Sequence, residues 1–547
     1  MSALHAAVGI TQGPGETANS YVFIARDPHN HLRHGEFVYY QAEERMVLGR
    51  ISKRELARSL PDNLLADPAV SPDHLAGLLG LDPPPSGLYR LSVSLLGYLD
   101  KALGFVNPHA LPVPGTPIYL AADAQLTALL SRLSAEATGA VQIGSLLTRE
   151  SGRVPLQLDA RGFTSTHLAI IASTGAGKSY LAGVIVEELM MPHNRAAVLV
   201  IDPHAEYDTL EDLQRLPQFA AADYAPQVQI LRPADIKVRM SSLEIGDLRY
   251  LMPNLSEKMH NNLNRAFKDS RSGARARGRW TFQHLREAIT KPADDTPEAT
   301  TDPTVGALLW RVEALAENKL FDADQDLKLG ELVRPGLCTI LQLNEIPERE
   351  QRVIVATILR RLNQARMDTV RGRTVRGAEN YLPYPVFVLI EEAHNYAPAS
   401  DDIITSAVLK QILSEGRKFG LGVGLISQRP GKLDSDVLSQ CMTQCILRVV
   451  NSVDQARIAE SVGSVGRDLL DELPNLSKGQ AIIAGASVNT PVLIQVRTRL
   501  TPHGAPDPDA PSQWRSYRND EPPEPHPARG IPPGAYPVLT FHEDDPF

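Results

Sequence analysis

A glycine-rich turn between a predicted strand and a predicted helix constrains this chain more than any other feature. Residues 172–179 read ASTGAGKS; they follow the apolar run 167–171 and precede the helical pattern 180–191. In this setting the backbone N–H groups of the turn and the first turn of the helix form a concave anion site. The pattern predicts a phosphate-binding loop (Walker A), in which Lys178 contacts the β- and γ-phosphates and the Ser179 hydroxyl contacts Mg²⁺.

One position departs from the usual pattern G-x-x-x-x-G-K-[ST], because Ala172 replaces the first glycine. Alanine is compatible with this position if its φ is negative, and two later glycines keep the tight part of the turn. A phosphate-binding loop is common to kinases, GTPases and motors, so it does not decide the class. The nucleotide contacts that we expect come from Thr174, Gly175, Ala176, Gly177, Lys178, Ser179 and Tyr180.

The composition is that of a multidomain globular protein. With 547 residues, 43% of them hydrophobic and 22% charged, the chain is too long for one core, so we expect two to four domains. Cys338, Cys441 and Cys445 have no metal-ligand spacing, which predicts buried thiols in a reducing compartment. We expect no signal peptide, no membrane span and a cytoplasmic protein, because no run approaches 18 apolar residues. The net charge of −9 does not exclude nucleic acid, since local fields decide such binding.

The two ends of the chain differ from its centre. Residues 1–125 contain short apolar stretches separated by Gly, Pro and Asn, which predicts a small N-terminal β-barrel with a polar, proline-rich insertion at 59–85. Residues 501–547 are so rich in proline that little regular structure is possible, and we expect an extended C-terminal arm. Its apolar tip, 536–542, either docks on a neighbouring subunit or is disordered.

Strands and helices alternate in the centre, as in a parallel sheet that is covered by helices. We expect the ATPase core in two parts, 126–240 and 331–500, separated by an inserted helical subdomain at 241–330. Within the insertion, the arginines of 271–279 predict a flexible basic loop that either contacts DNA or is solvated. Near-continuous apolar runs predict buried strands at 167–172, 197–202, 337–343, 386–390, 421–427 and 445–450.

Two consecutive carboxylates follow the apolar strand 386–390, and they favour one class of phosphate-loop protein over the others. We expect Glu391 to lie against Mg²⁺ (Walker B), and Glu392 to orient and deprotonate a water as catalytic base. Hydrolytic motors need the second carboxylate, whereas switch GTPases and small-molecule kinases usually lack it. The alternative is that the two acids cap a surface helix. Glu391 stands where aspartate is commoner, so it would act through a Mg²⁺-bound water.

Two further residues flank the strand 421–427. Gln428 follows this strand, where its amide can contact the attacking water or the γ-phosphate as a sensor. Arg417 precedes the strand and is either an arginine finger for the next subunit's nucleotide or a salt-bridged surface residue; such a finger is worth ~10³ to 10⁵ in rate. Arg429 and Lys432, on the following loop, are instead candidates for DNA contact.

A fourth strand end carries Asp202, His204 and Glu206. Three such residues suggest a metal site, but only one is histidine, and a Mg²⁺ site is already predicted elsewhere. We therefore favour a role near the nucleotide or a subunit interface.

Taken in order, these segments resemble the HerA family of the HerA/FtsK superfamily. The segment PGTPIY at 114–119 closes a region that resembles the family's N-terminal barrel. The motor segments that carry the resemblance are HLAII at 167–171, TGAGKS at 174–179, DPHAEY at 202–207, EEAH at 391–394, GRKFG at 416–420, SQRP at 427–430 and SQCMTQCILR at 439–448.

The resemblance implies an α/β fold: a RecA-like P-loop ATPase core with an N-terminal β-barrel, an inserted helical subdomain and an extended C-terminal arm. It implies a homohexameric double-stranded DNA translocase or helicase that uses ATP and Mg²⁺. Such motors act with a NurA-type nuclease in DNA end resection during double-strand break repair. Two alternatives stay open: the motor of an anti-phage complex with another effector protein, or a nucleotide-gated DNA clamp. Membrane-anchored pumps share the motor, but no membrane segment is expected here.

Overall fold

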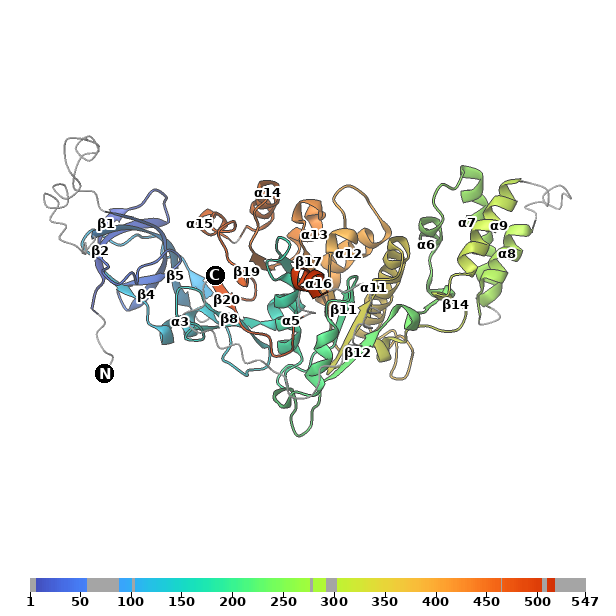
Figure 1. Cartoon of the computed structure of the whole chain (residues 1–547), viewed down its shortest axis with the longest axis horizontal. Coiled ribbons are helices and arrows are strands. Elements are labelled where there is room, and N and C mark those ends of the chain that lie inside the picture. The colour runs from blue at the N-terminus through green and yellow to red at the C-terminus, as the bar shows by residue number, and fades with distance from the viewer. Residues whose placement is uncertain are drawn as a thin grey trace. The chain divides into compact units, whose positions relative to one another are not determined.

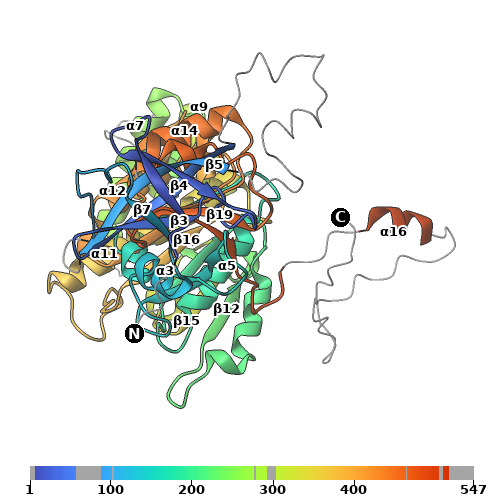
Figure 2. The same ribbon diagram turned by 90° about the vertical axis from the view of Figure 1, so that its left-hand side faces the viewer.

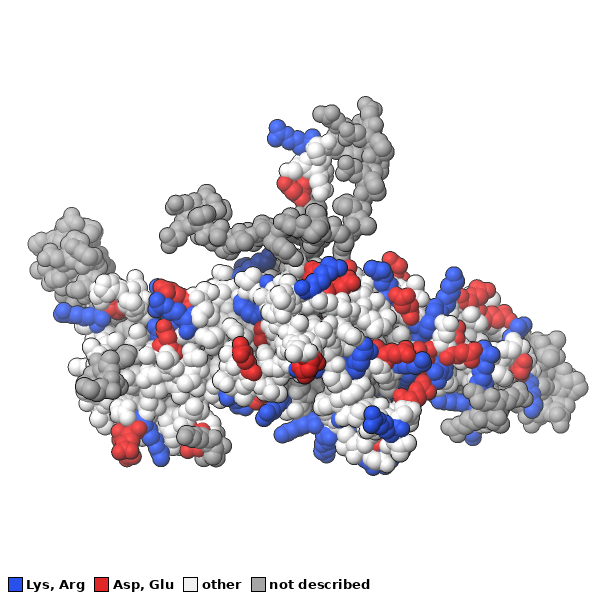
Figure 3. All heavy atoms as spheres, turned by 90° about the horizontal axis from the view of Figure 1, so that it is seen from below, with Lys and Arg blue, Asp and Glu red and all other residues white. Residues whose placement is uncertain are grey.

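The computed structural model describes residues 6–56, 88–100, 104–275, 279–291, 303–463, 465–503 and 509–516 (Figure 1). By compactness the chain divides into two units, Met1–His503 and Gly504–Phe547. In the described ranges, no helix is both long and apolar enough to cross a bilayer. On the face that Figure 3 displays, basic and acidic side chains are interspersed.

The N-terminal strands form a closed barrel, which Figure 2 turns toward the viewer. Six strands follow one another in the order β2-β1-β7-β3-β4-β5, and β5 pairs back to β2. Alternate side chains of β5, such as Leu91 and Val93, point into a core that includes Tyr21 and Phe23. The expected barrel is therefore confirmed; the predicted insertion at 59–85 lies outside the described residues. The strands are β1 (Gly9–Pro14), β2 (Ser20–Arg26), β3 (Phe37–Ala42), β4 (Arg45–Leu56), β5 (Leu88–Asp100), β6 (Gly104–Val106) and β7 (Pro117–Leu120).

The centre of the described chain is an eleven-stranded sheet in the order β12-β15-β11-β16-β17-β10-β18-β19-β20-β8-β9. The pairs from β12 to β18 are parallel, and those from β18 to β9 are antiparallel. All six predicted buried strands are present. The strands are β8 (Ala140–Leu146), β9 (Pro155–Asp159), β10 (Leu168–Ile171), β11 (Val198–Asp202), β12 (Gln227–Leu231), β15 (Leu337–Gln342), β16 (Val386–Ile390), β17 (Leu421–Ser427), β18 (Thr443–Leu447), β19 (Gln480–Gly485) and β20 (Val492–Val496).

Both faces of the sheet are apolar, because successive side chains of a strand point to opposite faces. In β10, Leu168 and Ile170 join one buried cluster with helix α5, while Ala169 and Ile171 join another with α11 and α12. This burial on two faces explains the near-continuous apolar runs in the sequence. The helices are α3 (Asp123–Leu130), α4 (Ala160–Thr164), α5 (Lys178–Leu189), α10 (Leu329–Leu332), α11 (Glu348–Val370), α12 (Ile404–Glu415), α13 (Ser435–Ser439), α14 (Ser452–Ser461) and α15 (Arg467–Leu470).

The chain between β12 and β15 is mainly helical, as expected. The chain enters this helical segment after β13 (Val238–Arg239) and leaves it at β14 (Phe321–Asp322), and these two short strands pair in parallel. Helices α7, α8 and α9 pack against one another. The helices of this segment are α6 (Ile245–Leu251), α7 (Glu257–Arg275), α8 (Phe282–Thr290) and α9 (Pro303–Ala316).

The interpretation of 271–279 as a loop was wrong for its first half, because 271–275 continue α7. The Arg271 guanidinium donates to the backbone oxygens of Ser241 and Leu243, and it lies 5.4 Å from the ring centroid of Phe267. These contacts hold the basic end of the helix in place. Residues 276–278 lie outside the described part of the chain.

The second unit is described only over 509–516, which includes the short helix α16 (Ala510–Ser516). The Asp509 carboxylate accepts the backbone N–H of Ser512 at 3.1 Å, which caps the first turn. The apolar tip at 536–542, for which docking and disorder were both left open, lies outside the described residues.

Candidate active site

The sheet topology brings three of the sequence motifs to one edge. β10, β17 and β16 are parallel neighbours, so their carboxyl ends meet at the same side of the sheet. The glycine-rich loop follows β10, the two carboxylates follow β16, and Gln428 follows β17. Ligand sites of open α/β sheets lie outside such strand ends.

The loop has the backbone that its glycines predict. Gly175 and Gly177 have φ values of 77° and 103°, in the region where only glycine is unstrained. Ala172 is buried and does not have a positive φ, so alanine is tolerated where the motif usually has glycine. The backbone N–H of Ser173 donates to the carbonyl of Arg448 at 2.8 Å and fixes the loop to the end of β18.

Lys178 is surrounded by carboxylates. Its Nζ contacts Oε1 of Glu391, and it lies 3.3 Å from Oε1 of Glu392. Burial disfavours the ammonium charge, but the carboxylates outweigh burial and raise the pKa of Lys178. Burial raises the pKa of the Glu391 carboxyl to about 7, although Lys178 opposes this shift. Tyr207 donates its hydroxyl proton to Glu391 Oε2 at 2.6 Å, so both oxygens of this carboxylate are held.

Glu392 differs from Glu391 in having one uncommitted oxygen. Its Oε2 is buried and has no hydrogen-bond partner, and Nδ1 of the His394 ring lies 3.3 Å from it. Burial, the largest effect, lowers the pKa of His394 despite the charge of Glu392. Glu392 also has a φ of 49°, a conformation that costs a non-glycine residue about 1–3 kcal/mol and that is concentrated at functional sites. A carboxylate with a free lone pair is chemically able to accept a proton from water.

Gln428 contacts the phosphate-binding loop directly. The Thr174 hydroxyl donates to Gln428 Oε1 at 2.7 Å. The hydroxyl of the preceding Ser427 accepts the backbone N–H of Arg429 at 3.1 Å and lies 3.2 Å from Nδ1 of His394. The ends of β16 and β17 are therefore linked to each other and to the loop.

Arg417 is not brought to this edge. It lies in a short 3₁₀ turn, Gly416–Lys418, before the amino end of β17, and its side chain is exposed. β17 has seven residues, which at ~3.3 Å per residue puts Arg417 about 20 Å from the strand end that carries Gln428. Arg417 therefore does not complete the site of its own chain.

The segment after β11, for which the sequence favoured a role near the nucleotide or a subunit interface, reaches the phosphate-binding loop through Glu206. The Asp202 carboxylate accepts the backbone N–H groups of His204, Glu206 and Tyr207 at 3.2 Å each, so it shapes the turn. Burial raises the pKa of Asp202 to about 6. The turn directs Glu206 to Ser179, whose hydroxyl donates to Glu206 Oε2. The spacing D-x-H-x-E-Y after a strand was the available signal, but it did not specify these partners.

The residues present fit a nucleotide with Mg²⁺. No group of three or more His, Cys, Asp or Glu side chains in the described ranges forms a dedicated metal cage. The oxygen donors near Lys178 include the Ser179 hydroxyl and the carboxylates of Glu391, Glu392 and Glu206, and Mg²⁺ binds such hard oxygens together with phosphate oxygens. Ser179 and Glu391 remain the predicted ligands of a Mg²⁺ ion bound with ATP, and the ion would supply charge neutralisation at the phosphates.

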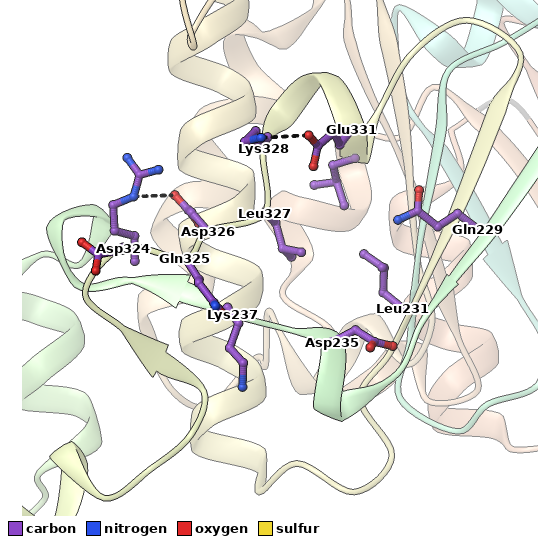
Figure 4. Close-up of a pocket in the computed structure, with 12 residues that line it drawn as sticks. Gln229, Leu231, Asp235, Lys237, Asp324, Gln325, Asp326, Leu327, Lys328 and Glu331 are labelled. Atoms are coloured by element: carbon purple, nitrogen blue, oxygen red, sulfur yellow. Dashed lines mark hydrogen bonds and ion pairs between the residues drawn. The ribbon is translucent and has the colours of Figure 1, made fainter.

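Two hollows lie apart from this edge. One, of about 480 Å³, lies beside β12 and β13, and Figure 4 shows acidic and basic side chains interleaved around it. There Lys328 pairs with Glu331 at 3.0 Å, so the charges largely neutralise one another. The other, of about 950 Å³, is mainly apolar and lies on the barrel beside β1 and β2. The three cysteines are buried and unpaired, as predicted, and burial raises the pKa of Cys338 and Cys445 to about 12.

Comparisons with known proteins agree with the motifs. The model of the helicase HerA central domain matches residues 141–362. A probable helicase of Methanocaldococcus jannaschii is 30% identical over 440 residues, which are 75% of this chain and 80% of that protein. The DNA double-strand break repair helicase HerA of Pyrococcus furiosus is 26% identical, over 74% of this chain and 77% of that protein. The protein with the same description from Sulfurisphaera tokodaii is 25% identical, over 94% of this chain and 97% of that protein.

Solved structures with some likeness include VirB4 of Thermoanaerobacter pseudethanolicus, with a TM-score of 0.47 and 16% identity, covering 67% of this chain and 98% of that one. The bacterial conjugative coupling protein TrwB has a TM-score of 0.43 and 15% identity, covering 71% and 95%.

The motif order, the matching central domain and the relatives that align along most of both chains lead to one assignment. This chain belongs to the HerA family of helicases, and it is an ATPase of the helicase class.

Proposed function

We propose that this chain is a homohexameric motor that hydrolyses ATP to translocate along double-stranded DNA. It acts with a NurA-type nuclease in DNA end resection and double-strand break repair. The observation that carries the proposal is the arrangement around Lys178, which contacts both Glu391 and Glu392 beside the phosphate-binding loop. The names of the relatives from Pyrococcus furiosus and Sulfurisphaera tokodaii support the repair role.

The hydrolytic step follows from the residues at this edge. The ammonium of Lys178 and the loop N–H groups bind the phosphates, and Ser179 and Glu391 hold Mg²⁺. Glu392, with its uncommitted Oε2, takes a proton from the attacking water. Gln428 senses the γ-phosphate through its contact with the loop.

A ring is proposed because Arg417, the predicted finger, lies away from the nucleotide edge of its own chain. Arg417 is exposed about 20 Å from the carboxyl end of its own strand, so it can act only on another subunit's nucleotide. A neighbouring subunit in a closed ring supplies such a residue in trans. Arg417 then stabilises the charge that develops as the γ-phosphate leaves.

DNA contact is proposed for the loop that follows Gln428. Arg429 and Lys432 are exposed on this loop, and both are close enough to His394 to lower its pKa. Phosphate contacts by these cations would place the duplex next to the residues that hydrolyse ATP. Contacts to phosphates carry no base information, so movement would be independent of sequence.

The test measures phosphate release by the wild-type chain with and without linear duplex DNA, alongside the oligomeric mass. We expect a ring in the presence of ATP and DNA, turnover that rises when DNA is added, and DNA affinity that falls steeply with salt. Lys178→Ala, the control for contaminating ATPase, should not turn over. Binding of DNA and ATP without turnover would instead identify a nucleotide-gated clamp, and a monomer that never hydrolyses ATP would refute the motor.

A further inference from the structure

The chain segment after β20 is fastened along the phosphate-loop helix α5. We call this segment, residues 497–503, the strap. Glu187 of α5 is fully buried, and its carboxylate accepts the backbone N–H groups of Leu500 and Thr501 at 3.0 and 2.8 Å. It also accepts the Thr501 hydroxyl at 2.7 Å and Nη1 of Arg497 at 2.9 Å. A buried carboxylate that is fully used in this way fixes the path of the strap.

Helix α5 is shaped to receive the strap. The side chain of Arg499 is 1% exposed and lies on Gly183, where an added Cβ would come within 2.6 Å of the guanidinium carbon. Glycine inside a helix is unfavourable relative to alanine, so its place here has a packing reason. Nη2 of Arg499 donates to the Thr501 hydroxyl at 2.7 Å. The strap is therefore packed against α5 through buried, specific contacts.

The strap ends at the mouth of the phosphate-binding loop. The backbone N–H of Arg499 donates to the Tyr180 hydroxyl at 2.7 Å. The ring of His503 lies edge-on to the ring of Tyr180, with centroids 5.1 Å apart and planes at 75°. Tyr180 immediately follows Ser179, the residue expected at Mg²⁺. We call the two rings the aromatic wall.

The wall presents a defined hydrogen-bond donor. Nδ1 of His503 lies 3.2 Å from Nη1 of Arg499, which can only donate, so the imidazole proton belongs on Nε2. Burial and the charge of Arg499 lower the pKa of His503, which favours this neutral form. His503 is exposed at its outer side.

We propose that the aromatic wall of Tyr180 and His503 binds the nucleoside part of ATP. The proposal rests on the proposed function, because it assumes that the triphosphate lies in the loop. In this proposal the base continues outward from the α-phosphate past the first turn of α5, where it contacts the Tyr180 and His503 rings. Stacking of a base on an aromatic side chain is worth enough to change affinity by about tenfold.

The test compares ATP with inorganic tripolyphosphate, which offers the same phosphates without a nucleoside, by calorimetry in the presence of Mg²⁺. We expect His503→Ala to weaken ATP binding about tenfold and to leave tripolyphosphate binding unchanged. His503→Phe, which keeps a ring, should recover most of the ATP affinity. The control is His260→Ala, on α7, which should bind both ligands like the wild type.

Two results would overturn the proposal. Equal losses for ATP and tripolyphosphate in His503→Ala would mean that the strap supports the loop and does not contact the nucleoside. Unchanged ATP binding in that variant would mean that the wall is not used. A wild-type chain that binds neither ligand would refute the proposed function itself, and the wall with it, so the two failures are distinguishable.

Discussion

The buried carboxyl of Glu391 makes a quantitative prediction about stability and pH. Its pKa is about 7 in the folded chain, against 4.5 for an unperturbed glutamate, because burial outweighs the attraction of Lys178. Between these two values the folded state binds more protons than the unfolded state. Stability therefore falls as the pH rises. From the two pKa values, this one group removes about 2–3 kcal/mol of unfolding free energy between pH 5 and pH 8.

The perturbation is Glu391→Gln, which keeps the size of the side chain but cannot ionise. Its urea-unfolding free energy is compared with that of the wild type at pH 5, 6, 7 and 8. Other buried acids, such as Asp202, titrate in both proteins and cancel in the difference. Lys178 loses a partner in the variant but keeps Glu392 at 3.3 Å, which adds an offset that does not change over this range.

We expect the difference, variant minus wild type, to rise by about 2–3 kcal/mol from pH 5 to pH 8, with most of the change below pH 7. The control Glu460→Gln removes an exposed carboxylate on α14 and should give a difference that is flat with pH. A flat difference for Glu391→Gln as well would show that the carboxyl titrates normally in the folded chain, and the description of this site as desolvated would be wrong.

Three further predictions concern other parts of the chain. Glu392→Gln should retain ATP binding in equilibrium titrations while steady-state phosphate release falls by at least ~10², the usual worth of a general base; normal turnover would refute its role. Gly183→Ala should lower the melting temperature, because the new Cβ displaces Arg499, whereas Gly306→Ala, where α9 has open space, should raise it slightly; equal effects would refute the packing argument. Arg417→Ala should leave ATP affinity unchanged but reduce turnover by ~10³ or more, and mixing it with Glu392→Gln subunits should restore some turnover if the residue acts in trans.

The sequence was most informative where one local rule decides the structure. The six central strands are buried on both faces, so each appears as an apolar run, and all were predicted. The missed strands lie where that rule fails. Edge strand β12 reads QVQIL, with polar residues at alternate positions, and β19 and β20 belong to the antiparallel end of the sheet. The end of α7 was misread because its arginines and glycine resemble a loop, and its contacts to Ser241 and Leu243 depend on tertiary packing.

In the candidate site, too, local patterns predicted some features, whereas contacts between distant residues were missed. Strand–loop–helix order predicted where Lys178 and Glu391 lie, because the carboxyl ends of parallel strands share one edge. The contact of Tyr207 with Glu391 joins residues that are 184 positions apart, and no spacing rule gives such a pair. The strap was missed for a similar reason. Its anchor, Glu187, reads in the sequence as an ordinary polar residue of a helix, but it is buried by a segment more than 300 positions later.

The pairing of β8 with β20 has a consequence for how the chain is made. Leu146 lies opposite Ile494 and Gly144 opposite Val496. The first strand of this sheet along the chain therefore pairs with the last one. During synthesis the barrel strands have all left the ribosome, and can fold, long before β20 exists. The β8–β9 hairpin must wait through about 330 more residues, with one side unpaired, until its partner emerges. An exposed strand edge of this kind is open to wrong pairing with other chains. A chain that ends before residue 492 would therefore lack the strand that joins β8 and β9 to the rest of the sheet.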